Sequence, residues 1–222
     1  MSDKPRGAIL QRDKETYAIV PSIPVGLVTP ENLENIANVA RKYEIPIIKI
    51  TSGQRFALVG IKKDDVDNVW KDLNMDVGEA SELCLHYVQA CPGTAVCKFG
   101  AQDSLGLGME IEKLFSGIDL PAKVKIGVSG CHFSCGESFV RDIGMLGMKK
   151  GWTLIIGGNS GYRTRIGDIL SEHLSKDEII NLTKKILEYY KNNARKRERM
   201  ARFVNRIGIK AIKEAILGSF PD

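Results

Sequence analysis

The sequence predicts an α+β fold in two parts, and three observations support it. Short β-prone runs alternate with amphipathic helical stretches in residues 1–78. Residues 79–222 hold further strands, and a helical tail runs from about Leu174 to the end. Between the parts, around Asp76–Ser81, the composition becomes polar and glycine-containing, which indicates a domain boundary.

The first part, residues 1–78, follows the order β-α-β-β-α. Thr29 stands where it would cap a helix opened by Pro30, and Gly53 separates two β-branched runs. The predicted elements are a strand at 16–20, a helix from residue 30 to about 40, strands at 46–50 and 56–61, and a helix at 66–73. This order resembles a ferredoxin-like half domain.

The second part, residues 79–222, is expected to contain a mixed sheet. Residues 123–128 alternate basic and apolar side chains, as an edge strand or a ligand-facing strand does. The other predicted elements are a helix ending at Phe115, hairpin strands at 145–149 and 153–156 around Gly151, and tail helices broken near residues 192–193 and at Gly208.

Composition limits the class of protein. The 222 residues contain no apolar run as long as the roughly 18 residues that a membrane-spanning helix needs. Residues 1–17 also lack the apolar core of a secretory signal peptide. We therefore expect a cytoplasmic protein in a reducing compartment, where its five cysteines do not form disulfides. A formal charge of +5, from 32 Lys and Arg against 27 Asp and Glu, favours an acidic partner or ligand.

Four cysteines form two close pairs, Cys91 and Cys97 in CPGTAVC and Cys131 and Cys135 in CHFSC. Four thiolates at one place need cations, and the neighbouring glycines would let the backbone approach a bulky inorganic group. The C-x3-C pair suits structural zinc, but C-x5-C is too wide for a common zinc knuckle and fits a cubane cluster better. The spacing favours a [4Fe–4S] cluster, with zinc or free buried thiols as alternatives. Cys84 is expected to be a core cysteine.

These segments resemble the sirohaem-containing sulfite and nitrite reductases. The matching motifs, in chain order, are ITSGQRFALVGI, CPGTAVCKFGAQDSLGLG, GVSGC, GWTLIIGGNSGYRTRIG and ARKRERMARFVNRIG. They cover roughly residues 15–216, and their order makes the resemblance specific. One copy of the unit is present, as in the small, single-repeat sulfite reductases of the assimilatory type.

The resemblance implies two cofactors. Cys91, Cys97, Cys131 and Cys135 would ligate one [4Fe–4S] cluster, and Cys135 would also bridge to the iron of a sirohaem. Six electrons would then convert sulfite to sulfide, or nitrite to ammonia. The sequence contains no dinucleotide-binding fingerprint, so the electrons are expected from an external donor. We expect a sulfite reductase, with a nitrite reductase or a non-catalytic [4Fe–4S] electron-transfer protein as alternatives.

Sirohaem carboxylates and small anionic substrates both need Arg and Lys partners. By resemblance, the candidates for catalysis are Arg55, His86, Lys123 and Lys125, and those for cofactor binding, beside Cys135, are Arg55, Lys98, Asn159, Arg163 and Arg165. Lys123 and Lys125 alternate along the predicted strand and would point to one face. The alternatives are a solvated edge face for the two lysines and ordinary surface positions for the two arginines.

Some positions depart from the family pattern. His86 stands where related reductases often carry Arg, and His132 stands where the family often has Pro. A histidine could donate protons near neutral pH, although a structural histidine is the alternative at both positions. Larger members carry an arginine two positions before Arg55, where this chain has Gly53.

The tail is expected to carry a basic helix face. Arg195, Arg199, Arg202 and Arg206 recur at helical spacing, opposite the apolar Met200, Phe203, Val204 and Ile207. An acidic electron donor such as ferredoxin could dock there; contacts to cofactor carboxylates and a solvated face are the alternatives. A nucleic-acid partner is disfavoured because no groove-reading motif accompanies the arginines. A monomer and a homo-oligomer are both compatible with the sequence.

Overall fold

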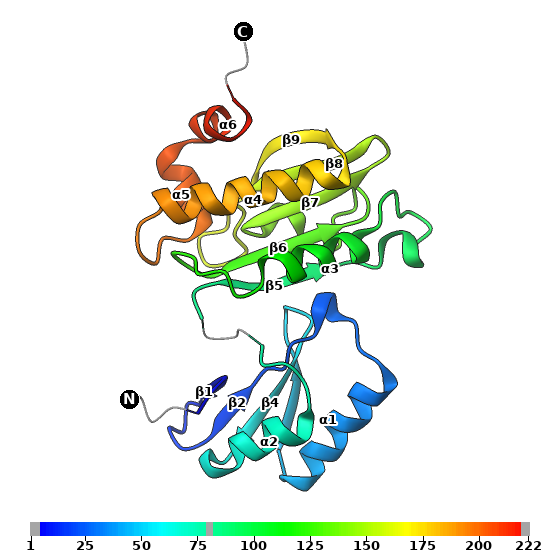
Figure 1. Ribbon diagram of the computed structural model, residues 1–222, viewed down its shortest axis with the longest axis vertical. Coiled ribbons are helices and arrows are strands. Elements are labelled where there is room, and N and C mark those ends of the chain that lie inside the picture. Colours follow the sequence, from blue (N-terminus) through cyan, green and yellow to red (C-terminus); the bar gives the residue numbers. More distant parts are fainter. Residues whose placement is uncertain (1–4, 79–81, 219–222) are drawn as a thin grey trace. The chain divides into compact units, whose positions relative to one another are not determined.

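The computed structural model describes residues 5–78 and 82–218, and the chain divides into two compact units, residues 1–82 and 83–222 (Figure 1). The predicted boundary falls beside residues 79–81, which lie outside the described residues. Helices and strands are mixed in both units, so the α+β class predicted from the sequence is confirmed.

The N-terminal unit is an antiparallel sheet covered by two helices. Its elements are β1 (Ala8–Leu10), β2 (Tyr17–Ile19), α1 (Pro30–Lys42), β3 (Ile47–Ile50), β4 (Phe56–Ile61) and α2 (Val66–Leu73), with 3-10 turns η1 (Pro24–Gly26) and η2 (Lys63–Asp65). The sheet order is β1-β2-β4-β3. The predicted order is therefore confirmed, with β1 as an added edge strand.

Local signals explain where these elements begin. The Thr29 side chain accepts a hydrogen bond from the Asn32 N–H, and Pro30 occupies the first turn of α1. Ile36 and Val39 of α1 are buried with Leu58 of β4 in one apolar core. That core gives the N-terminal unit its own hydrophobic stabilisation.

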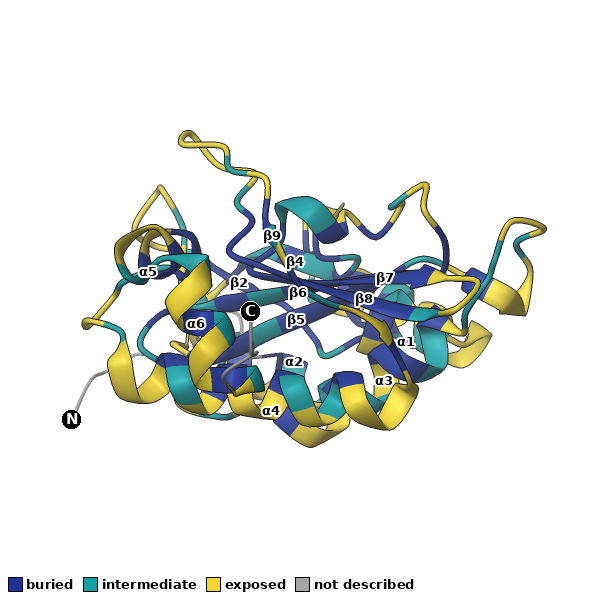
Figure 2. Cartoon of the chain, turned by 90° about the horizontal axis from the view of Figure 1, so that it is seen from above, coloured by how far each residue is buried: buried dark blue, intermediate teal, exposed yellow. Residues whose placement is uncertain are grey.

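The C-terminal unit is built on a five-stranded mixed sheet in the order β5-β6-β7-β8-β9. Its elements are β5 (Leu85–Ala90), α3 (Ser104–Phe115), β6 (Val124–Ser129), β7 (Ile143–Met148), β8 (Gly151–Ile156), β9 (Asp168–Leu174), α4 (Lys176–Asn193), α5 (Met200–Ile207) and α6 (Ile209–Leu217), with 3-10 turns η3 (Gly93–Ala95) and η4 (Ser138–Val140). Strands β5, β6 and β7 run parallel, whereas β8 is antiparallel to both of its neighbours. Figure 2 shows α3 and α4 on one face of this sheet, with their buried residues turned toward it.

The sequence placed β6 wrongly as a possible edge strand. It pairs with β5 on one side and β7 on the other, so a solvated edge face for Lys123 and Lys125 is wrong. The predicted hairpin of β7 and β8 around Gly151 is confirmed. Strands β5 and β9 were not predicted.

The helix face of four arginines expected in the tail is wrong, although Arg202 and Arg206 do lie exposed on α5. The helix α5 begins at Met200, and Arg195 and Arg199 precede it in a loop. Helix α4 has already ended at Asn193, and in the loop that follows the Glu198 carboxylate accepts from the Arg195 N–H at 2.8 Å and from the Arg206 guanidinium. Within the described residues, no helix is both long and apolar enough to cross a membrane.

Candidate functional site

The two cysteine pairs follow neighbouring parallel strands. Cys91 comes directly after β5, and Cys131 comes two residues after β6. Ala90 pairs with Val128, so the carboxyl ends of both strands meet at one edge of the sheet. There the Cys91 N–H donates to the Val128 carbonyl, and the Gly130 N–H donates to the Cys91 sulfur, each at 3.1 Å.

Glycines hold the two cysteine segments against each other. A Cβ atom added at Gly130 would lie 2.7 Å from the Cα of Gly93, and one added at Gly100 would lie 2.6 Å from the Gly93 carbonyl carbon. No side chain fits at either position without moving backbone. Gly130 therefore lets the backbones of the two cysteine segments meet, whereas the close approach to an inorganic group that the sequence suggested stays a prediction.

The cysteines differ in exposure. Cys131 is buried, Cys91 and Cys97 are half-buried, Cys135 is exposed, and Cys84 is buried away from solvent, as expected of a core cysteine. Among the described residues, no three His, Cys, Asp or Glu side chains are gathered closely enough to hold a metal ion. The chemistry of four thiols on two touching segments fits an iron–sulfur cluster, and the ligand set stays a prediction.

The segment from Cys131 to Asp142 folds back over β6. Its Gly136 carbonyl and the Arg141 side chain pack against Gly127 of β6. A Cβ atom added at Gly127 would lie 2.3 Å from the Gly136 carbonyl oxygen and 2.8 Å from the Arg141 Cγ. Arg141 and Asp142 are thereby brought beside Lys125. A cavity of about 270 Å³, the basic cavity, opens there and is lined by Lys125, Val140, Arg141, Asp142, Gly158, Asn159, Ser160, Gly161 and Arg199.

Buried ion pairs organise the basic cavity. The Arg199 guanidinium donates twice to the buried Asp142 carboxylate, at 2.7 and 3.0 Å, and the Lys125 N–H donates to the same carboxylate at 2.9 Å. Arg141 forms an ion pair with Glu137 and donates to Gln89. Within the described residues, the buried Nε atoms of Arg141 and Arg199 have no hydrogen-bond partner. Two donors of this kind fit an anionic ligand such as a carboxylate or an oxyanion.

Burial and charge shift the pKa values of this group. Burial lowers the pKa of Lys125 below its ordinary value, and the positive charges of Arg199, Arg141 and Lys123 lower it further, against the opposing effect of Asp142. Burial raises the pKa of Asp142, whereas the Arg199 guanidinium and the Lys125 N–H oppose the rise. The Lys125 ammonium group also lies 5.6 Å from the centroid of the Tyr87 ring.

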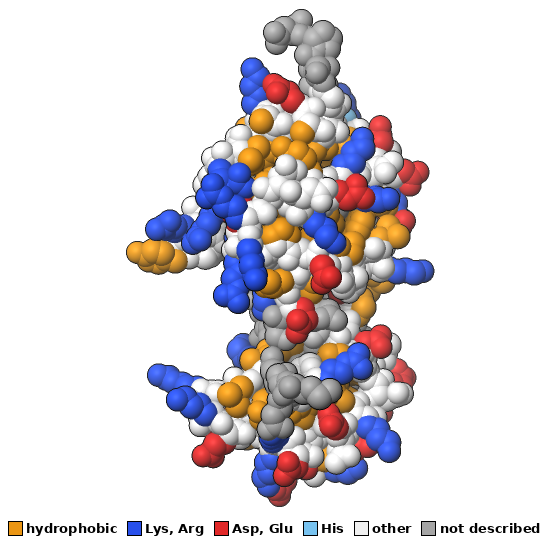
Figure 3. All heavy atoms as spheres, turned by 60° about the vertical axis from the view of Figure 1, so that its left-hand side comes forward, with side chains coloured by type: hydrophobic (Ala, Val, Ile, Leu, Met, Phe, Trp, Pro, Cys, Tyr) orange, Lys and Arg blue, Asp and Glu red, His pale blue; other side chains and the backbone are white. Residues whose placement is uncertain are grey.

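The loop between β8 and β9 carries three further predicted residues. Asn159, Arg163 and Arg165 line a second cavity of about 430 Å³, the loop cavity, together with Tyr162, Thr164, Arg199, Ala201, Arg202 and Asn205. Arg165 ties the loop down, because it pairs with Asp168 at 2.5 Å and donates to Asn205 and to backbone carbonyls. Arg163 is exposed, which leaves it the better placed of the two for a ligand. Figure 3 shows Lys and Arg side chains gathered on one side of the C-terminal unit.

The remaining predicted residues are not among those that line the basic cavity. Arg55 is buried in the N-terminal unit, at the turn between β3 and β4. Lys98 is exposed beside Cys97, with its ammonium 4.9 Å from the Phe99 ring centroid. His86 is the extra residue of a β-bulge in β5, and its ring centroid lies 5.5 Å from that of Tyr87. Lys123 is half-buried and immediately precedes β6, and its positive charge contributes to the lowered pKa of Lys125.

Sequence reasoning missed Arg141, Asp142, Tyr87 and Gln89. The signal available was an Arg-Asp pair directly before the apolar strand β7, where a charged pair needs buried partners. Arg199 was noticed, but as part of a helix face that the structure does not contain. Its true partner, Asp142, lies 57 positions earlier in the chain.

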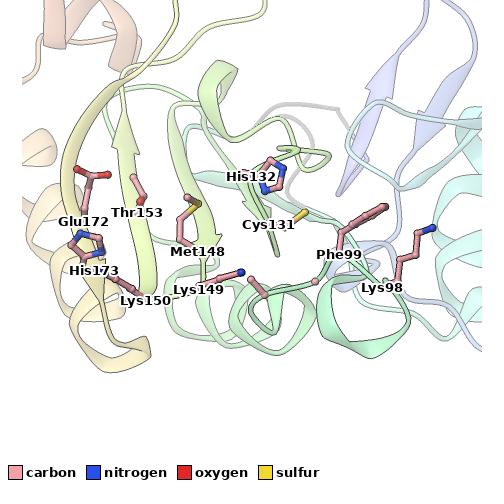
Figure 4. A pocket seen from close by; sticks show the side chains of 13 residues that line it. Lys98, Phe99, Cys131, His132, Met148, Lys149, Lys150, Thr153, Glu172 and His173 are labelled. Atoms are coloured by element: carbon pink, nitrogen blue, oxygen red, sulfur yellow. The ribbon is translucent and has the colours of Figure 1, made fainter.

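Figure 4 shows a third cavity, of about 830 Å³, in which Cys131 lies between Phe99 and Met148. We call it the cysteine cavity. It is lined by Lys98, Phe99, Gly100, Ala101, Cys131, His132, Gly147, Met148, Lys149, Lys150, Thr153, Glu172 and His173. Lys98, predicted to bind a cofactor, therefore lies here and not in the basic cavity.

Comparisons with known proteins match the whole described fold. The model of the nitrite/sulfite reductase ferredoxin-like half domain matches residues 9–76, and that of the nitrite and sulphite reductase 4Fe-4S domain matches residues 82–220. The chain is 62% identical over 218 residues to an assimilatory-type sulfite reductase of Nitratidesulfovibrio vulgaris, covering 98% of this chain and 100% of the relative.

Two further matches are more distant. A nitrite reductase (NAD(P)H) of Bacillus subtilis is 40% identical over 209 residues, which cover 94% of this chain and 26% of the relative. The crystal structure of dissimilatory sulfite reductase I shares the fold, with a TM-score of 0.83 at 14% identity, over 93% of this chain and 70% of that one. With both of its units matched by family models, the chain belongs to the nitrite and sulphite reductase family.

Proposed function

We propose that this protein is a sulfite reductase, which reduces sulfite to sulfide with six electrons from an external donor. The observation that carries the proposal is the 62% identity to an assimilatory-type sulfite reductase over that protein's full length. The basic cavity supports it, because Lys125, Arg141 and Arg199 place positive charge and two buried donors around one space. A small oxyanion needs such donors.

We also propose that Cys91, Cys97, Cys131 and Cys135 hold one [4Fe–4S] cluster and that Cys135 joins it to the iron of a sirohaem. The matched 4Fe-4S domain and the contact between the two cysteine segments support this assignment. When bound, the two cofactors would pass the external donor's electrons on and supply the iron that binds the substrate. The proposal also includes a cytoplasmic location, since thiolate ligands are best preserved in a reducing compartment.

The residues of the basic cavity would bind and orient charge. The Nε atoms of Arg141 and Arg199 would donate to the substrate or to a cofactor carboxylate, and Arg163 and Arg202 of the loop cavity would donate to further carboxylates. Lys125 would give a proton from its Nζ to an oxygen that leaves as water, because its lowered pKa makes that transfer easier. Asp142 would hold Arg199 in place.

The first experiment is an absorption spectrum of anaerobically purified protein, with iron, acid-labile sulfide and tetrapyrrole assayed on the same sample. A chlorin-type haem spectrum with about five irons per chain would support both cofactors. About four irons without tetrapyrrole, and no binding of added sirohaem, would instead identify an electron-transfer protein and overturn the enzyme proposal.

Nitrite reduction is the second candidate, favoured by the 40% identity to a nitrite reductase. Steady-state rates with sulfite and nitrite, driven by a reduced dye, separate the two. We expect the larger kcat/KM for sulfite. A preference for nitrite of about tenfold or more, which is about 1.4 kcal/mol of transition-state binding, would reverse the order.

A further inference from the structure

The cysteine cavity is not used by the proposed chemistry of the basic cavity. Its wall contains Cys131, one of the four proposed cluster ligands. Figure 4 shows Lys98 and Phe99 on one side of Cys131 and Met148 and Lys149 on the other. The cavity is therefore a route from solvent to the cluster site.

The rim of the cysteine cavity is basic. The residues that line it include three lysines, Lys98, Lys149 and Lys150, but a single carboxylate, that of Glu172. Lys149 and Lys150 are exposed at the turn between β7 and β8. In the part of the chain that the structure describes, none of the three lysines forms an ion pair. Their charges are free to attract an acidic surface.

Apolar side chains stand exposed next to this rim. Phe99 and Phe133 are 52% and 56% exposed, and their rings meet edge to face with centroids 5.1 Å apart. Val96, between Cys91 and Cys97, is 81% exposed. Exposed aromatic side chains beside unpaired lysines are typical of a transient protein interface.

We propose that an acidic one-electron carrier protein docks on this surface, defined by Lys98, Lys149, Lys150, Phe99 and Phe133. The proposal rests on the proposed function, because it needs a cluster beside Cys131 that accepts electrons. At each docking the carrier is oxidised and the cluster is reduced by one electron; six such transfers, with six protons, turn bisulfite into hydrosulfide and three waters. The arginines of the tail are poorer candidates, since Arg199 and Arg206 already pair with Asp142 and Glu198.

The test is a charge reversal at the hairpin turn, Lys149→Glu with Lys150→Glu. The matched control reverses Lys184 and Lys185, an exposed pair on α4 that does not line the cysteine cavity. Each variant is assayed for sulfite reduction with reduced methyl viologen and with an acidic [2Fe–2S] ferredoxin. Binding of the ferredoxin is measured separately by titration at about 50 and 300 mM salt.

For the hairpin variant we expect ferredoxin-driven kcat/KM to fall at least about tenfold, with weaker binding that salt no longer affects, while viologen-driven rates stay unchanged. The control should match the wild type in every assay. Wild-type ferredoxin binding and rates that survive the hairpin reversal would overturn the docking surface. Tighter binding of a short mixed-sequence oligonucleotide than of ferredoxin, lost in the same variant, would assign it to nucleic acid and overturn it too.

The two proposals fail in different ways. If the wild type does not reduce sulfite even with methyl viologen, the proposed function fails. Salt-dependent binding of ferredoxin that the hairpin reversal abolishes would then still support the docking surface. If viologen supports turnover but ferredoxin neither binds nor donates, the docking proposal alone fails.

Discussion

At the scale of single residues, burial and neighbouring positive charge act on the same ammonium group, that of Lys125. Its lowered pKa means that Lys125 loses its charge at a lower pH than the ordinary 10.5. Anion binding needs the charged form, so kcat/KM for sulfite should fall as pH rises through that lowered value. In Lys125→Arg the guanidinium stays charged, and the fall should move to higher pH. An unchanged alkaline limb in a pH profile would count against this role.

Removing both lysines tests their contribution directly. Replacing Lys123 and Lys125 together by Met should lower kcat/KM for sulfite by roughly 10–1000-fold, the scale on which lost charge-stabilising donors act. Iron and tetrapyrrole content should stay at wild-type values, because neither lysine is a proposed cluster ligand. A variant with full activity would return both lysines to a structural role.

The cysteines offer a matched pair of substitutions. Cys135→Ser should abolish turnover and lower tetrapyrrole or iron content, because this exposed cysteine is the proposed link between the two cofactors. Cys84→Ala should keep its iron and lose only about 1 kcal/mol of stability, as a small buried group does. Loss of iron in the Cys84 variant would show that the ligand set was chosen wrongly.

At the scale of elements, the cysteine segments depend on glycine. In Gly130→Ala the new methyl group would meet the Gly93 Cα at 2.7 Å and push the two segments apart, so we expect most of the cluster iron to be lost. The control is Gly161→Ala, whose added Cβ meets nothing closer than 3.3 Å and which should keep its iron. The measurement is iron and acid-labile sulfide per chain. Equal iron in both variants would show that the close contact is not needed.

The loop between α4 and α5 is held by the carboxylate of Glu198, which accepts hydrogen bonds from Arg195 and Arg206. Hydrogen bonds from Arg206 lower the pKa of Glu198 from 4.5 to about 2. A carboxylate with a lowered pKa stabilises the fold fully at pH values above its ordinary pKa. That stabilisation is lost as pH falls through the lowered pKa of about 2. Glu198→Gln should therefore lower the urea midpoint at pH 7, and the difference from wild type should shrink as pH falls below about 4.5. A difference that is constant with pH would contradict the assignment.

The sequence predicted elements well where the signals are local. Thr29 and Pro30 give α1 its first turn, and the hairpin of β7 and β8 follows from two apolar runs around Gly151. Strand β5 was missed because its His86 and Gln89 interrupt the apolar run of LHYVQA. Gln89 is buried there and accepts a hydrogen bond from Arg141 of a distant segment, a partner that the local sequence does not reveal.

The candidate site divides in the same way. The cysteine pairs could be predicted because their residue type and spacing lie within one short motif each. The basic cavity could not, because Asp142 and Arg199 meet only after the segment from Cys131 folds back over β6 and the tail returns to the sheet. The expected arginine stripe was wrong because the chain is not helical between Asn193 and Met200, so Arg195 and Arg199 are out of phase with Arg202 and Arg206.

At the scale of the whole molecule, each unit should unfold by itself. The N-terminal unit has its own core, and all four proposed cluster ligands belong to the C-terminal unit. We expect calorimetry to show two transitions, and removal of iron by a chelator to lower the midpoint of one of them only. Equal shifts of both transitions, or a single transition, would contradict independent units.

The hydrogen bond from the Gly130 N–H to the Cys91 sulfur has a consequence for redox poise. Hydrogen bonds to cluster sulfurs draw electron density from them and help to set the reduction potential. This donor belongs to the backbone, so no change of side chain removes it without also disturbing the glycine contact. If Cys91 ligates the cluster as proposed, one share of the midpoint potential is fixed by the path of the backbone, and adjustment is left to the surroundings of the other three proposed ligands.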